Sequence, residues 1–213
     1  MKLSNFLLSI LATIILGIAV GSSFMVVSHH SSAQIYVKGE AGDNLSIDLP
    51  KNLSHHQAEL LSMAYDIAKK DGHEQPQLLQ GIILQESKAG DMSSYKVAGQ
   101  EMGLKTNMRY YGVAQIKLAA ARDVLAKWPD LISQFEFHTN TDEEIIAKLI
   151  ENDRFNLAIA SKYLLIMKSY GYSTIKQLAT AYNQGPGGAK LVDANNNKYS
   201  SGVQAHIQEL KIK

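Results

Sequence analysis

The chain has 213 residues, of which 46% are hydrophobic and 19% are charged, a balance typical of a folded globular protein. Its formal net charge of +1 gives no electrostatic case for a nucleic-acid partner. The absence of cysteine excludes a disulfide framework, a thiolate metal site, a cysteine nucleophile and a lipidated N-terminal cysteine.

Residues 1–33 have the features of an export segment, either a signal peptide or a membrane anchor. Lys2 supplies a minimal positive start, and residues 6–20 form an apolar run that small residues follow. The run extends through residues 24–27 to about 22 residues, which is long enough to span a bilayer. The pattern therefore predicts export to the periplasm or cell envelope, with signal cleavage and retention in the cytoplasmic membrane both open.

Residues 34–53 predict an extended arm or a small hairpin. Ile35 and Val37 alternate with polar residues, as do Leu45 and Ile47 after a turn-rich stretch. No pattern in this stretch indicates chemistry.

Residues 54–213 predict a single, mainly α domain. Ser54 and Gln57 have the spacing of a capping box, and Pro76 suits the first turn of the next helix. Residues 88–110 predict a long loop with at most a short helical or strand piece. The remaining expected elements are an Ala-rich helix ending at Trp128, a helix with a capping box of Thr141 and Glu144, a helix over 155–170 capped by Asp153, a helix opened by Ser173, a loop at 183–188 and an amphipathic stretch over 203–210.

An acidic side chain ends one apolar helical face. Leu79, Ile82, Ile83 and Glu86 fall at i, i+3, i+4 and i+7, which places them on the same face of a helix. Because burial disfavours the charged form of a carboxyl group, the pKa of Glu86 is expected to be raised. A carboxyl that stays protonated near neutral pH can act as a general acid. The alternative is that Glu86 lies at a frayed helix end and turns out to water.

Tyr182 occupies a parallel position at the end of another apolar stripe. Ile175 and Leu178 precede it on the same helical face, and Asn183 and a loop follow it. Helix ends that converge on one cleft would bring Glu86 and Tyr182 together. The alternative is an ordinary core tyrosine.

The histidines and acids offer no chelating pattern. Four of the seven histidines come as adjacent pairs, which point about 100° apart on a helix and so differ from the i, i+4 pairs that bind zinc. The acidic run at 142–144 lies in the first turn of a predicted helix, where it favours the helix dipole. We therefore expect neither a metal nor another cofactor.

Three short blocks follow one another along the chain. They read Ile-Leu-Gln-Glu-Ser at 83–87, Tyr-Gly-Val-Ala-Gln-Ile at 111–116 and Ala-Thr-Ala-Tyr-Asn-Gln-Gly-Pro-Gly at 179–187. In order and approximate spacing they resemble the signature of the soluble lytic transglycosylase family, which has a Glu-Ser pair, a Gly-Leu-Met-Gln turn and an Ala-Tyr-Asn block before a glycine-rich turn. Two departures stand out: Val113 and Ala114 replace Leu-Met, and the stretches 88–110 and 130–141 look longer than usual.

The resemblance covers roughly residues 54–210 and implies a lysozyme-like, mostly α fold. It also implies cleavage of the β-1,4 bond between N-acetylmuramic acid and N-acetylglucosamine in peptidoglycan, with a 1,6-anhydro ring as the product end. Glu86 would protonate the glycosidic oxygen and then, as a carboxylate, accept the proton of the muramyl C6 hydroxyl.

The resemblance implies supporting roles for four further residues. Tyr182 would lie near the acid and the developing oxocarbenium ion. Gln115 and Asn183 would line the sugar site, and Ser87 would support the cleft around the acid. The implied partners are peptidoglycan glycan strands, the inner membrane through the N-terminal segment, and a secretion or wall-remodelling machine.

Two other functions remain open at the level of sequence. A muramidase-type hydrolase on the same fold, as in goose-type lysozymes, needs a second acid or a held water, and Asp91 and Glu101 in the long loop are the candidates for that acid. A non-catalytic peptidoglycan-binding or assembly module needs no acid at all.

Overall fold

The fold was obtained as a computed structural model. It describes residues 24–29, 32–38, 44–48, 53–91, 96–100, 104–139 and 141–212. The apolar run at 6–20 and Glu101 therefore lie outside the described residues. Over the described part the chain is mainly helical, as its periodicity predicts, with eight α-helices and a small two-stranded antiparallel sheet in the helical domain.

The helices follow the predicted order. Their bounds are α1 (His55–Lys70), α2 (Gln77–Ser87), α3 (Leu118–Lys127), α4 (Asp130–Gln134), α5 (Asp142–Glu151), α6 (Asp153–Ser169), α7 (Ile175–Ala189) and α8 (Lys198–Glu209), with a 3₁₀ turn η1 (Thr106–Met108). The strands are β1 (Phe24–His29), β2 (Ser32–Lys38), β3 (Asn44–Asp48), β4 (Val97–Ala98), β5 (Tyr110–Tyr111) and β6 (Lys211–Ile212).

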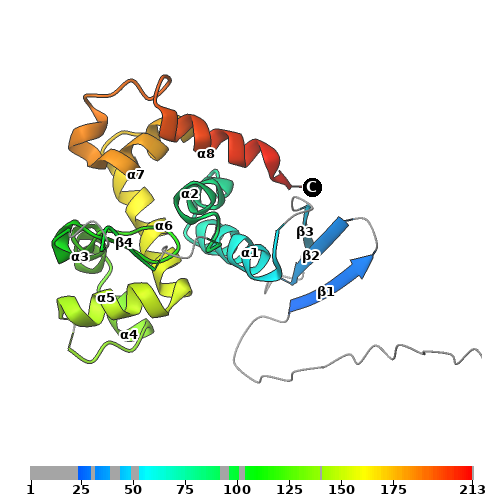
Figure 1. Cartoon of the computed structure of the whole chain (residues 1–213), viewed down its shortest axis with the longest axis horizontal. Coiled ribbons are helices and arrows are strands. Elements are labelled where there is room, and N and C mark those ends of the chain that lie inside the picture. The colour runs from blue at the N-terminus through cyan, green and yellow to red at the C-terminus, as the bar shows by residue number, and fades with distance from the viewer. Residues whose placement is uncertain are drawn as a thin grey trace, which may run out of the picture.

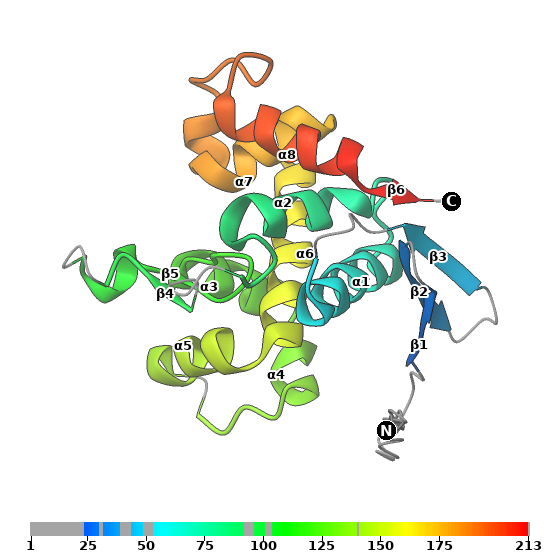
Figure 2. The ribbon, with the colours of Figure 1, turned by 45° about the vertical axis from the view of Figure 1, so that its right-hand side comes forward.

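Helix α6 is the centre of the domain. Figures 1 and 2 show it running through the middle, with α7 and α8 gathered at one end and α4 and α5 at the other. It packs against α1, α3, α5 and α7, and its side chains are buried on almost every side. Helix α2 lies between α1 and α8 (Figure 1). An acid at the end of α2 is therefore enclosed by other helices.

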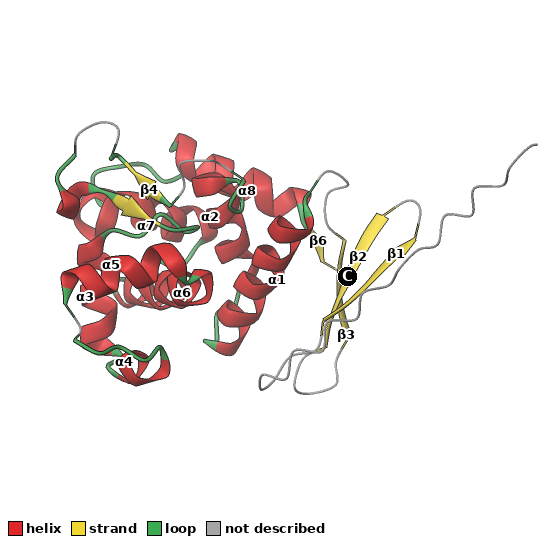
Figure 3. Ribbon diagram, turned by 60° about the horizontal axis from the view of Figure 1, so that its bottom comes forward, coloured by secondary structure: helices red, strands yellow, loops and turns green. Residues whose placement is uncertain are grey.

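Four strands form a second sheet beside the helices, in the order β1-β2-β3-β6 (Figure 3). Strands β2 and β3 pair antiparallel, with Ile35 opposite Ile47, in the stretch expected to form an arm or hairpin. Strand β1 takes up residues that the sequence pattern treats as an extension of the apolar run. Among the residues described, no helix has both the length and the apolar character needed to cross a bilayer.

Local capping signals are partly right. Ser54 and Gln57 form the predicted capping box, with the Ser54 N–H donating to Gln57 Oε1 at 2.8 Å. Helix α6 is capped by Asn152 rather than by Asp153, because Asn152 has the extended backbone that lets its side chain accept from the Phe155 N–H.

Helix α7 begins one residue later than predicted, and it corrects the predicted loop at 183–188. Thr174, not Ser173, is its N-cap and forms a capping box with Gln177. The loop prediction is wrong because helical backbone continues on both sides of a kink at Gly185, where φ is +74°. Pro186 then starts the second helical piece, a position where its missing N–H costs no helical hydrogen bond.

Two stretches that look like additions contain regular structure in their described residues. The long loop at 88–110 contains the β4–β5 pair and η1, which fits the expectation of a short strand or helical piece. Residues 130–141 contain α4, and Phe135 and Phe137 pack their rings on Phe155 at centroid distances of 5.1 and 5.3 Å. The Glu144 carboxylate accepts from the His138 and Thr139 N–H groups, so it holds this stretch against the start of α5.

Candidate active site

Glu86 lies in the last turn of α2 and faces a pocket. The helix is anchored by fully buried Leu79, Ile82 and Ile83, so the residues before the acid form core. Burial raises the pKa of Glu86 from 4.5 to about 7. At neutral pH this carboxyl is therefore divided between its acid and its carboxylate forms, as a group that must both give and take a proton requires.

Tyr199 is the hydrogen-bond partner of Glu86. Its hydroxyl donates to Glu86 Oε1 at 2.6 Å, and this bond to the charged form opposes part of the effect of burial on the Glu86 pKa. Burial and the nearby Glu86 raise the pKa of Tyr199 well above its usual range, so the hydroxyl stays a donor. Sequence reasoning missed Tyr199, because it lies near the start of α8 and in none of the three blocks.

The second block forms a tight turn beside Glu86. Gly112 has a φ of +72° and Gln115 a φ of +51°, both in the left-handed region. Gln115 Nε2 donates to the Gly112 carbonyl at 2.8 Å, so the side chain lies back across its own turn. Tyr111 and Ile116 close the turn through two mutual backbone hydrogen bonds of 3.0 Å.

Asn156 of α6 holds this turn from below. Its Oδ1 accepts from the Ala114 N–H at 2.8 Å, and its Nδ2 donates to the Tyr111 carbonyl at 2.8 Å. The side chain is fully buried. The one feature of the sequence that could have indicated this role is an amide side chain on the otherwise apolar face of a predicted helix.

Tyr182 closes the other side of the pocket. Its hydroxyl donates to the Ala114 carbonyl at 2.7 Å, and its ring packs edge-on to Tyr163 at a centroid distance of 5.7 Å. Burial and the proximity of Glu86 raise the pKa of Tyr182 well above its usual range, so it is a neutral donor. The first helical piece of α7 ends just beyond it, and Asn183 follows at the rim, where its Oδ1 accepts from Gln184 Nε2.

Among the five residues that the family resemblance assigns to the site, Ser87 alone does not line the pocket. It is fully buried, and its hydroxyl donates to the Val113 carbonyl at 2.7 Å. Its oxygen also accepts from the Gly90 N–H at 3.0 Å. Ser87 therefore ties the end of α2 to the turn of the second block.

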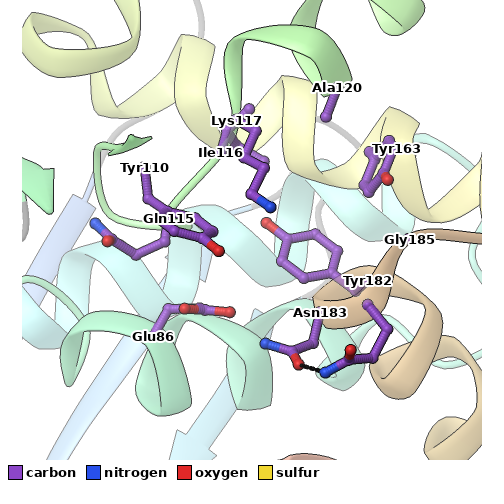
Figure 4. A pocket seen from close by; sticks show the side chains of 11 residues that line it. Glu86, Tyr110, Gln115, Ile116, Lys117, Ala120, Tyr163, Tyr182, Asn183 and Gly185 are labelled. Atoms are coloured by element: carbon purple, nitrogen blue, oxygen red, sulfur yellow. Dashed lines mark hydrogen bonds between the residues drawn. The ribbon is translucent and has the colours of Figure 1, made fainter. Parts of the chain in front are cut away.

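One pocket contains the other predicted site residues. Figure 4 shows Glu86 and Tyr182 on opposite sides of it, with Gln115 above the acid and Asn183 below Tyr182. Its lining comprises Glu86, Tyr110, Gln115, Ile116, Lys117, Ala120, Tyr163, Tyr182, Asn183, Gln184 and Gly185. Within this lining, Glu86 is the single acid and Lys117 the single cation. Asp91, a candidate second acid, is exposed and outside the lining.

The pocket lining therefore combines one protonatable carboxyl, one cation, three amide side chains and three tyrosines, and the hydroxyl of Tyr182 is fixed by its hydrogen bond to the Ala114 carbonyl. Among the described residues, no group of three or more histidine or acidic side chains is arranged to hold a metal ion. Amide side chains and aromatic faces suit a hydroxyl-rich ligand.

Comparisons with family models, with curated proteins and with solved structures find no match for this chain.

Proposed function

We propose that the chain is a lytic transglycosylase that cleaves the MurNAc-β-1,4-GlcNAc bond of peptidoglycan. The observation that carries the proposal is a lone carboxyl with a pKa of about 7 in a pocket whose described lining holds no second acid. Glycosidases that use water typically use two carboxyl groups. A single group suits a reaction in which it acts first as acid and then as base.

In the proposed reaction Glu86 donates its proton to the glycosidic oxygen as the bond from that oxygen to the muramyl C1 breaks. The positive charge on the ring then faces the Glu86 carboxylate. The muramyl C6 oxygen bonds to C1, and its hydroxyl proton passes to Glu86. The acid is regenerated, no water is consumed, and the product ends in a 1,6-anhydro ring.

The other pocket residues support this assignment through placement. Tyr199 holds the Glu86 carboxyl at 2.6 Å, and Tyr182 supports the turn that carries Gln115. Gln115 and Asn183 line the pocket, and in the proposed complex they contact sugar hydroxyl and acetamido groups. The proposal includes a lysozyme-like fold, which a mainly helical domain with an acid at the end of a helix packed between α1 and α8 supports.

The proposed location is the periplasm or cell envelope, because the polymer lies outside the cytoplasmic membrane and residues 1–33 have an export pattern. The proposed partners follow from that location. They are the glycan strands themselves, the inner membrane through the N-terminal segment, and a secretion or wall-remodelling machine.

Product analysis separates this function from its nearest rival. We expect digestion of purified peptidoglycan by the full-length chain to release fragments with 1,6-anhydro ends, which mass spectrometry detects as a loss of one water relative to reducing ends. Reducing ends that carry ¹⁸O from labelled water would instead establish a muramidase-type hydrolase. If the peptidoglycan stays intact after prolonged incubation, the result would favour a non-catalytic binding or assembly module.

Removal of the Tyr199 hydroxyl is expected to move the pH profile. Tyr199→Phe deletes a hydrogen bond to the charged form of Glu86, so the pKa of Glu86 should rise above 7 by about one unit. Because the first step needs the protonated acid, the alkaline limb of kcat/KM should shift to higher pH. Tyr163→Phe is the matched control, since the Tyr163 ring lines the same pocket and packs on Tyr182. An equal shift in both variants, or none in Tyr199→Phe, would contradict this role.

A further inference from the structure

The backbone of Lys117 is held in place at the pocket that contains Glu86. It is the N-cap residue of α3 and directly follows the turn that the Tyr111 and Ile116 hydrogen bonds close. Its side chain is exposed and belongs to the pocket lining. Figure 4 shows it extending towards the space between Gln115 and Tyr182.

The Lys117 ammonium group is held by an aromatic ring instead of an acid. Its Nζ lies 4.8 Å from the centroid of the Tyr110 ring. None of the ion pairs found among the described residues includes Lys117. Burial raises the pKa of Glu86, and the hydrogen bond from Tyr199 opposes part of that rise. Among the described residues the ammonium group contacts an aromatic ring but has no acidic partner, so it is available to an anionic ligand.

We infer that Lys117 binds a carboxylate of the substrate and makes the pocket selective for anionic glycans over neutral ones. The inference rests on the proposed function. On a peptidoglycan strand, the acidic groups nearest to the scissile bond hang from the 3-O-lactyl substituent of the muramyl sugar. The carboxylate is that of the lactyl group itself on a strand without peptide, or one within the peptide when the lactyl group is amidated. An oligomer of N-acetylglucosamine carries neither.

Binding to the inactive full-length Glu86→Gln chain tests this inference without turnover. The probes are three soluble tetrasaccharides: a neutral N-acetylglucosamine oligomer, a MurNAc-GlcNAc repeat with free lactyl carboxylates, and the same repeat carrying its peptides. Isothermal calorimetry at low salt should show at least one anionic probe binding about tenfold more tightly than the neutral probe, the size expected for one charge-assisted hydrogen bond. The probe that shows the preference identifies which carboxylate is bound.

A second substitution assigns the preference to one side chain. Adding Lys117→Met to the Glu86→Gln chain should remove the preference and leave neutral binding within about twofold, whereas Lys117→Arg should keep it. Lys127→Met is the matched control. Lys127 lies at the other end of α3, also over an aromatic ring, that of Trp128, but outside the pocket lining. Raising the salt concentration should weaken the preference in every chain that keeps a cation at position 117.

The outcomes separate this inference from the proposed function. Equal binding of neutral and anionic probes, or a preference that survives Lys117→Met, would overturn the role of Lys117 while glycan binding stands. Absence of binding to all three probes, together with intact peptidoglycan after incubation with the wild-type chain, would overturn both.

Discussion

Glu86→Gln is expected to abolish clearing of a peptidoglycan gel, with a rate loss of about 10³-fold or more. Glutamine keeps the shape of the side chain and can still accept the hydrogen bond from the Tyr199 hydroxyl. It can neither donate a proton to the glycosidic oxygen nor take one from the C6 hydroxyl. The measurement is the release of anhydro-ended fragments over time by the purified full-length chain. Asp91→Asn serves as the control, since Asp91 is an exposed carboxylate outside the pocket lining.

Clearing that survives Glu86→Gln would remove Glu86 from the mechanism. Loss of activity in Asp91→Asn as well would favour a hydrolase that uses two acids. Either result would contradict the lone-acid reaction proposed for this pocket.

The same variant should be more stable than the wild type at alkaline pH. Because the folded-state pKa of Glu86 is about 7 and its ordinary value is 4.5, the folded chain binds more protons than the unfolded chain between these values. Wild-type stability therefore falls as pH rises through this window, by up to about 3 kcal/mol. Thermal melts at pH 4 and pH 8 should show Glu86→Gln gaining relative to the wild type only at pH 8. A gain of equal size at both pH values would mean that ionisation of Glu86 is not its cause.

Gly112→Ala is expected to cost about 3 kcal/mol or more of folding free energy. The new Cβ would overlap the Asn156 amide and the Leu149 carbonyl, and the φ of +72° disfavours any L side chain. Relief of the overlap requires Asn156 to move, which would break its bonds to Tyr111 and Ala114. Urea unfolding followed by circular dichroism measures the loss.

Gly171→Ala is the matched control for the backbone strain alone. Gly171 also has a left-handed backbone, with a φ of +93°, but a Cβ there would meet nothing within 4 Å. We expect a loss of about 1 kcal/mol for this variant. If the two alanine variants lose the same stability, close packing against Asn156 does not determine the turn.

Helix content and order were predictable because the signals are local. Apolar spacing placed each of the longer helices, since backbone hydrogen bonds and burial of one helical face act within a few turns. Cap positions were less predictable: Asn152 and Asp153 are adjacent capping residues, and only the backbone of the folded chain decides which one caps α6. The Gly185 and Pro186 pair does break the helix locally, yet helical backbone resumes immediately after it.

The contacts around the site depend on residues far apart in the chain. Asn156 holds the turn at Gly112 from a helix about forty positions later, and its buried amide could equally have bonded elsewhere. Ser87 has the polarity of a site residue, but the direction of its side chain on α2 turns it into the interior and onto Val113.

By itself the sequence determined that Glu86 ends an apolar helical face, because helical spacing is local. The burial that raises its pKa to about 7 comes from the helices packed around it. Only the tertiary structure decided what surrounds that acid. The packing of α2 against α8 brings in Tyr199, 113 positions away, and the closed turn before α3 places Lys117 at the same pocket. These partners are set by which helices pack together, and that choice depends on the burial of the whole core instead of on any single stretch.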